Sequence, residues 1–143
     1  MPEFAGVAHI ELTVRDADRS AEWYERVLGM QKIAENAEDQ HDTPGVLARV
    51  INLRHPSAGL ILGLIRHKSG TDQKFSEFQV GLDHLALAVA SRDALEQWVE
   101  HLDGHGVQHS PISDRWYGSV VVFRDPDNIQ LELFFRSGAV ARP

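Results

Sequence analysis

The chain has 143 residues, of which 43% are hydrophobic and 24% are charged, and its formal net charge is −7. No stretch approaches the ~18 consecutive apolar residues of a membrane span, and the negative charge argues against nucleic acid or an anionic membrane as partner. The sequence has no cysteine, which excludes disulfides, thiolate metal ligands and a cysteine nucleophile. Residues 1–4 lack the basic and apolar regions of a secretory signal, so we expect a cytoplasmic protein.

The first half predicts one helix among four strands. Residues 8–14 alternate between apolar and polar positions, as a half-buried strand does. Apolar and aromatic residues then recur at helical spacing over 17–28, between the N-cap residue Asp16 and a C-cap glycine, Gly29. Three further strands are predicted at 30–34, 46–53 and 60–66.

The second half repeats the first. A shift of 75 residues places His9 on His84, and the alternating residues after each histidine also match. A strand is predicted at 82–90, followed by a helix that Ser91 caps and that ends at Gly104 and Gly106. The remaining predicted strands are 107–110, 118–124 and 129–135.

The order is therefore βαβββ, written twice. The sequence predicts an α+β fold with modules at 1–66 and 81–143, a linker at 67–80 and one compact domain overall. Each module should form a mixed sheet with its helix on one face. The helix-facing side takes Ile10, Leu12, Leu85, Leu87, Leu131 and Leu133. The opposite side takes His9, Glu11, Thr13, His84, Ala86, Gln130, Glu132 and Phe134, a set too polar for a packed core, so we expect it to line a cavity.

Three residues on that polar side suggest a metal site. The repeat makes His9 and His84 equivalent, and it pairs Glu132 of the last strand with Gly63 of the first module. A carboxylate in the middle of a strand must be paired, protonated or metal-bound, because burying it alone costs several kcal/mol. Two imidazoles and a carboxylate are a ligand set for a divalent ion. The alternative is a hydrogen-bonded histidine pair in a pocket without metal.

The chain resembles the vicinal oxygen chelate superfamily, which includes glyoxalase I, bleomycin-resistance proteins, fosfomycin-resistance thiol transferases, methylmalonyl-CoA epimerases and extradiol dioxygenases. The resemblance covers about residues 7–135. It is carried by four segments: 9–14, 23–30, 82–87 and the stretch Phe123-Arg-Asp-Pro-Asp-Asn-Ile-Gln-Leu-Glu132-Leu.

The resemblance implies a cupped half-barrel with a divalent metal ion (Fe(II), Mn, Ni or Zn) held by His9, His84 and Glu132. It also implies a homodimer and a small-molecule substrate that binds the ion through two adjacent oxygens. Gly63 departs from glyoxalase I and the epimerases, which have Glu or Gln there. Two histidines and one glutamate resemble the ligand set of extradiol dioxygenases and that of the fosfomycin-resistance thiol transferases, and we expect Gly63 to leave room for substrate.

Three further residues are candidates for acid–base chemistry. His67 lies four residues beyond Gly63 and so on the same strand face. Glu11 follows His9 on the cavity side and could orient a ligand or act as base, and Tyr117 could donate a hydrogen bond to a substrate oxygen. Each also has a structural interpretation: a surface histidine, an exposed strand carboxylate and a packed tyrosine.

The sequence therefore favours a metal-dependent enzyme, a dioxygenase or a lyase, over other functions. The alternative is a non-catalytic protein that binds a small molecule, as bleomycin-resistance proteins do. A thiol transferase acting on an antibiotic epoxide is disfavoured, because the last strands carry no cluster of Lys and Arg for a phosphonate.

Overall fold

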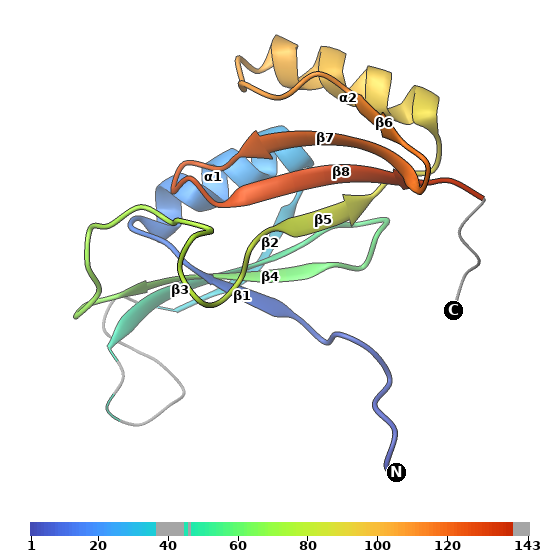
Figure 1. Ribbon diagram of the computed structural model, residues 1–143. Helices are drawn as coiled ribbons and strands as arrows, with labels where there is room; N and C mark the ends of the chain where they lie inside the picture. The colour runs from blue at the N-terminus through green and yellow to red at the C-terminus, as the bar shows by residue number, and fades with distance from the viewer. Residues whose placement is uncertain (37–44, 46, 139–143) are drawn as a thin grey trace. The chain divides into compact units, whose positions relative to one another are not determined.

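The computed structural model describes residues 1–36, 45 and 47–138, which form two compact units, Met1–Gln73 and Lys74–Pro143. Each unit contains one helix and a four-stranded mixed sheet in the order βαβββ (Figure 1). The predicted α+β class with two βαβββ modules is therefore confirmed. The boundary between the units falls within the segment 67–80 that the sequence predicts as a linker.

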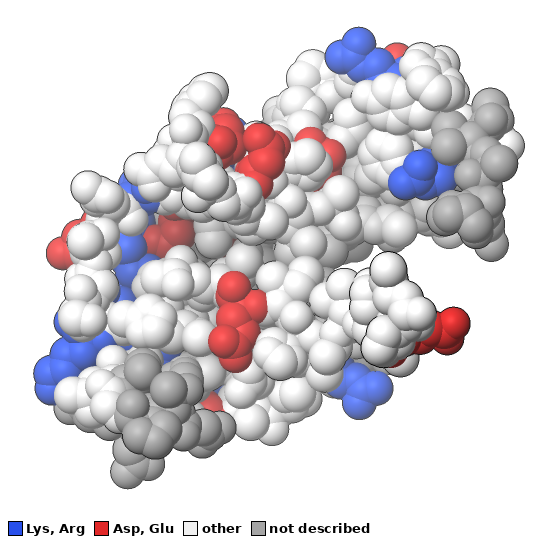
Figure 2. Space-filling model, turned by 60° about the horizontal axis from the view of Figure 1, so that its bottom comes forward, with Lys and Arg blue, Asp and Glu red and all other residues white. Residues whose placement is uncertain are grey.

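Charged side chains are scattered over the face of the molecule that Figure 2 shows. On the face shown in Figure 2, acidic and basic groups form small separate patches on a mostly uncharged surface. Among the described residues, no helix has both the length and the apolar character needed to cross a membrane.

The first unit is built around two central strands. It comprises β1 (Ile10–Thr13), α1 (Ala17–Leu28), β2 (Gln31–Glu35), β3 (Ala48–Arg54) and β4 (Ile61–His67). Residue 46, where the sequence predicts the third strand to begin, lies outside the described residues. The sheet order is β1-β4-β3-β2, with β1 parallel to β4 and the other pairs antiparallel. The apolar sides of α1, β1, β3 and β4 form its core, which includes Leu12, Tyr24, Val27, Ile51, Leu53, Leu62 and Leu64.

Helix α1 has the predicted limits because its two caps fix them. The Asp16 side chain accepts a hydrogen bond from the backbone N–H of Arg19 at 3.0 Å, which satisfies one of the free donors of the first turn. Gly29 ends the helix with φ +65°, a conformation that glycine adopts without the steric cost of a side chain.

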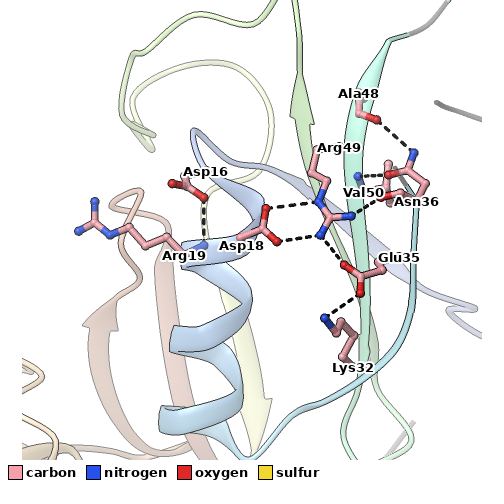
Figure 3. A network of polar contacts seen from close by, with 9 residues as sticks. All are labelled: Asp16, Asp18, Arg19, Lys32, Glu35, Asn36, Ala48, Arg49 and Val50. Atoms are coloured by element: carbon pink, nitrogen blue, oxygen red, sulfur yellow. Dashed lines mark hydrogen bonds and ion pairs between the residues drawn. The ribbon is translucent and has the colours of Figure 1, made fainter. Parts of the chain in front are cut away.

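An arginine ties this helix to the sheet. The guanidinium of Arg49 on β3 donates to the carboxylates of Asp18 on α1 and Glu35 on β2, and to the backbone carbonyl of Asn36 (Figure 3). Hydrogen bonding from Arg49 is the largest influence on Asp18 and lowers its pKa below its usual value. These contacts connect the start of α1 with the β2–β3 edge of the sheet.

The second unit repeats this topology. Its elements are β5 (Leu85–Ala88), α2 (Arg92–Gly104), β6 (Ser113–Arg115), β7 (Gly118–Arg124) and β8 (Gln130–Arg136), in the sheet order β5-β8-β7-β6. Strand β5 is parallel to β8, as β1 is to β4. Leu131 and Leu133 are buried on the helix side, as predicted, together with Leu95, Leu102, Val121 and Phe123.

Two predicted strands of this unit need correction. The segment 107–110 makes only an isolated bridge, between His109 and Phe123, and the third strand is instead β6, beyond Pro111. The strand predicted at 82–90 is shorter, so that His84 lies immediately before β5 rather than within it.

The start of the second unit is held by a clamp. Arg124 at the end of β7 donates to both carboxylate oxygens of Glu77, at 2.7 and 3.1 Å. The Asn128 side-chain amide donates to the backbone carbonyl of Phe75 at 3.0 Å. Hydrogen bonding from Arg124 lowers the pKa of Glu77 to about 2. Segment 74–80 is thereby fixed against the turn between β7 and β8.

Candidate metal centre

The second unit brings together two of the predicted ligands. Glu132 on β8 lies opposite Ala86 of β5 in the parallel register. The imidazole of His84, just before β5, has its Nε2 atom 3.5 Å from Oε2 of Glu132. The His84 side chain is 38% exposed and that of Glu132 is 16% exposed, so the pair is open to solvent on the histidine side.

The other nitrogen of His84 is held by a neighbouring carboxylate. Its Nδ1 lies 2.6 Å from Oδ1 of Asp83. A carboxylate in this position accepts a hydrogen bond from Nδ1–H, and the other ring nitrogen, Nε2, faces Glu132. Metal-binding histidines usually have such a partner on the nitrogen that does not bind the ion.

The surroundings of Glu132 leave its carboxylate available. Gln130 approaches one carboxylate oxygen at 3.5 Å with its side-chain amide. The nearby guanidinium of Arg124 donates instead to Glu77, to the carbonyl of Asn128 and to the side-chain oxygen of Gln130. Gln130 thus links the two groups, because it accepts a hydrogen bond from Arg124 and approaches Glu132 with its amide nitrogen.

The first unit holds the equivalent histidine beside a different acid. His9 precedes β1, and its Nε2 lies 4.0 Å from Oε1 of Glu11 on the same strand. Glu11 lies opposite Gly63 in the register of β1 with β4. The pairs Glu11–Gly63 and Ala86–Glu132 therefore occupy equivalent places, but the carboxylate is on the first strand in one unit and on the last strand in the other.

The space above Gly63 is not open, contrary to our expectation from the sequence. A Cβ atom built on Gly63 would lie 2.8 Å from Cγ and 3.2 Å from Oε1 of Glu11. On the other side it would lie 3.2 Å from Oδ1 of Asn52, the residue opposite Gly63 on β3. The Glu11 side chain thus occupies the room that the glycine leaves.

Neither unit assembles three ligands by itself. Within residues 1–36, 45 and 47–138, no group of three or more His, Asp or Glu side chains is placed to hold a metal ion. What the structure provides is two separate pairs, His84 with Glu132 and His9 with Glu11.

The other candidates lie further along the same strand faces. His67 ends β4, four residues from Gly63, which corresponds to roughly 13 Å along a strand; it borders a hollow with Leu47, Lys68 and Ser69. The ring of Tyr117 stacks on Phe134 with centroids 6.1 Å apart, and Phe134 is the next residue after Glu132 on that face of β8. Tyr117 therefore extends the face that carries the acid.

Sequence reasoning missed two residues that shape these pairs. Asp83 directly precedes His84, and a carboxylate beside a candidate ligand was a signal that could have been used. Asn52 could not be assigned without the register of β3 against β4, because nothing in its own segment distinguishes it.

Comparison with known proteins identifies the family of the chain. Residues 6–133 match the model of the Glyoxalase/Bleomycin resistance protein/Dioxygenase superfamily. The chain belongs to this family. A solved glyoxylase/bleomycin resistance protein/dioxygenase domain from Frankia sp. EAN1pec is 32% identical and superposes with a TM-score of 0.82, over 94% of this chain and 100% of that one.

Two other relatives are more distant. The fosfomycin resistance protein FosX from Listeria monocytogenes, solved as a mutant with Mn(II) and 1S,2S-dihydroxypropylphosphonic acid, shares the fold with a TM-score of 0.66 at 20% identity, over 92% of this chain and 93% of that one. "Putative ring-cleaving dioxygenase MhqA" from Bacillus subtilis (strain 168) is 24% identical over 131 residues, which are 90% of this chain. The chain spans 39% of the length of that relative.

Proposed function

We propose that this protein is a divalent-metal-dependent enzyme acting on a small substrate that binds the ion through two adjacent oxygens. His9, His84 and Glu132 would hold the ion, which is Fe(II), Mn, Ni or Zn. The observation that carries the proposal is the approach of His84 to Glu132 at 3.5 Å, with Asp83 on the far nitrogen of the imidazole.

The donor chemistry of this pair fits a cation. With its proton on the Asp83 side, a neutral His84 presents a lone pair to the Glu132 carboxylate, and two acceptors that face each other need a cation or a proton between them. Two donor atoms ~2.1 Å from a shared ion lie about 3 Å apart at a right angle and about 3.4 Å apart at a tetrahedral angle. The separation of 3.5 Å between Nε2 and Oε2 is close to that range.

The residues of the chain would divide the work. A bound ion supplies Lewis acidity, or electrons if it is iron, to the oxygens of the substrate. His84 and Glu132 fix the ion, and Asp83 orients His84. Tyr117 and Phe134 extend the same face with stacked rings, which suits a planar substrate. His67, Glu11 and Tyr117 are the candidates for proton transfer.

Within this family we favour a dioxygenase-like reaction over a glyoxalase-like one. Strand β4 carries Gly63 where glyoxalase I has Glu or Gln, and the ligand set then resembles that of extradiol dioxygenases. The name of the Bacillus relative supports this direction. We propose further that the protein is a homodimer.

The alternative is a protein that binds a small molecule without chemistry, of the bleomycin-resistance type. It is favoured by one observation: the described residues of each unit provide ligand pairs rather than a complete site. Such a protein would use His84 and Glu132 as a hydrogen-bonded pair and would bind its ligand without an ion.

Metal analysis separates the two functions. Protein purified without oxygen or chelators should contain close to one divalent ion per chain, and His84→Ala should lose it while keeping its circular dichroism spectrum. His101→Ala, an exposed histidine on α2, is the matched control and should keep the ion. Wild-type protein that takes up no Fe(II), Mn(II), Ni(II) or Zn(II), or His84→Ala with full occupancy, would overturn the proposal. Oxygen consumption with catechols, against loss of a hemithioacetal, then tests the reaction type.

A further inference from the structure

The end of β8 carries an arginine beside an aromatic ring, on the face of the second sheet opposite α2. Glu132, Phe134 and Arg136 alternate with the buried residues of the strand, so their side chains leave the same face. The guanidinium carbon of Arg136 lies over the ring of Phe134, 5.5 Å from its centroid. A cation is attracted to the face of an aromatic ring at this distance, so the contact holds the guanidinium beside the ring.

Two further aromatic residues approach this contact from the turn between β6 and β7. The ring of Tyr117 is nearly parallel to that of Phe134, with 21° between the planes and 6.1 Å between the centroids. The ring of Trp116 meets Tyr117 edge-on at 5.4 Å. Ser137, directly after β8, donates its backbone N–H to the carbonyl of Tyr117 and its hydroxyl to the carbonyl of Trp116. These hydrogen bonds fix the turn beside the end of β8.

The neighbours of Phe134 on the sheet leave its ring accessible. Ala88 on β5 and Val120 on β7 lie opposite Phe134 on its two sides, and Ala88 is exposed. A Cβ atom built on Gly118 would lie 3.0 Å from Cζ of Phe134. The ring therefore extends over the backbone at Gly118, which has no side chain to obstruct it. The result is an aromatic surface with room in front of it.

The charge of Arg136 is not used in the way that other arginines of this unit use theirs. Arg92 is paired with Asp114, and Arg124 is paired with Glu77. Arg136 is exposed and forms no ion pair within the part of the chain that the structure describes. A guanidinium without an acidic partner presents a planar fork of N–H donors, which suits the two oxygens of a carboxylate.

We propose that Arg136, Phe134 and Tyr117 form a subsite for a planar aromatic carboxylate, whose ring packs on the two rings and whose carboxylate binds the guanidinium. This inference rests on the proposed function in taking that ligand to be the substrate, and it deepens the function by naming a substrate class. Glu132 lies four residues before Arg136, roughly 13 Å along a strand. A substrate that reaches both places therefore carries its two adjacent oxygens and its carboxylate at opposite ends.

Ligands without adjacent oxygens test the subsite separately from any metal site. With the whole chain treated with a chelator, isothermal titration should show naphthoate binding about fivefold more tightly than the neutral naphthamide, as expected for an exposed ion pair. Arg136→Gln should bind both ligands with the affinity that the wild type has for naphthamide. Arg26→Gln, an exposed arginine in the last turn of α1, is the matched control and should keep the preference.

The aromatic part of the subsite makes a different prediction. Phe134→Leu should weaken the binding of both ligands about fivefold while keeping the preference for naphthoate, because it removes ring packing and leaves the charge. Tyr117→Leu tests the same point at the turn, where the side chain is 38% exposed, and so without altering β8. Circular dichroism spectra should match that of the wild type. Unchanged affinities in both variants would overturn the inference.

The inference and the proposed function fail in different ways. Wild-type protein that binds neither ligand or binds both equally overturns the inference, as does Arg136→Gln that keeps the preference. If the wild type holds a divalent ion but does not distinguish the two ligands, only the subsite is wrong. If it distinguishes them through Arg136 but takes up no ion, the metal-dependent function is overturned and the subsite belongs to a protein that binds its ligand without chemistry.

Discussion

Both units place a carboxylate near their histidine, but the carboxylate comes from the first strand in one unit and from the last strand in the other. Across β5, β8 and β7 of the second unit, the row reads Ala86, Glu132 and Val122, and across β1, β4 and β3 of the first unit it reads Glu11, Gly63 and Asn52. In each row one position on β1/β4 or β5/β8 carries the carboxylate and the other is nearly bare. The comparison teaches that a carboxylate near the histidine can come from either of two adjacent strands, the first strand in one unit and the last in the other.

The largest expected effect on metal binding comes from removing the acid of the second unit from β8 and placing an acid on β5 instead, as in the first unit. Glu132→Gly should weaken binding of a divalent ion by at least about 100-fold, since it removes a direct ligand and leaves the lone pair of His84 without a cation. Adding Ala86→Glu places an acid on β5, as Glu11 is on β1, and should recover at least about tenfold. Isothermal titration with Mn(II) measures both variants. A double variant no better than Glu132→Gly would show that the two rows are not interchangeable.

A smaller effect is expected from the partner of His84. Asp83 holds Nδ1 at 2.6 Å, whereas the residue before His9 is an alanine. Asp83→Asn should weaken metal binding by roughly tenfold, because the amide holds the imidazole less firmly in the tautomer that binds an ion. The same titration applies, with the exposed Asp93→Asn on α2 as control. Unchanged affinity would mean that Asp83 does not orient the ligand.

The smallest effect concerns the clamp that Arg124 forms with Glu77 at the start of the second unit. Arg124 lowers the pKa of Glu77 to about 2, from a usual value of 4.5. The folded-state pKa is the lower one, so the ion pair stabilises the fold above about pH 4.5 and this stabilisation is lost as the pH falls toward 2. Glu77→Gln should therefore lose less stability between pH 5 and 3 than the wild type, as urea unfolding at the two pH values would show. Glu100→Gln, exposed on α2, should retain the wild-type dependence, and equal slopes in all three proteins would contradict the assignment.

Much of the fold could be predicted because the apolar spacing, the helix caps and the internal repeat indicate the same order of helices and strands. Helix α1 was predicted to the residue, since Asp16 and Gly29 leave little choice of limits. Strand β6 was missed because it is only three residues long, Ser113 to Arg115, and all three are polar. The segment before Pro111, which was predicted instead, makes only an isolated bridge. The sequence pattern predicted the secondary structure correctly where the apolar positions of the pattern also form the core. The prediction failed at β6, where pairing with β7 determines which residues form the strand.

The candidate site could be predicted in part for a similar reason. The repeat singled out His84 and Glu132, which the structure brings to 3.5 Å. It also suggested that Gly63 marks an opening, which was wrong. The sequence around Gly63 does not show which residues of the neighbouring strands lie beside it. The side chain that fills that space belongs to Glu11, 52 residues earlier in the chain. The register of β1 against β4, which places Glu11 beside Gly63, therefore determines whether the space at residue 63 is open.

The contact between Glu11 and Gly63 also couples substitutions at the two positions. A Cβ atom at 63 would lie 2.8 Å from Cγ of Glu11, so a side chain at 63 requires Glu11 to take another rotamer or to be replaced. The effects of changing the two residues together should therefore differ from the sum of the effects of changing each alone.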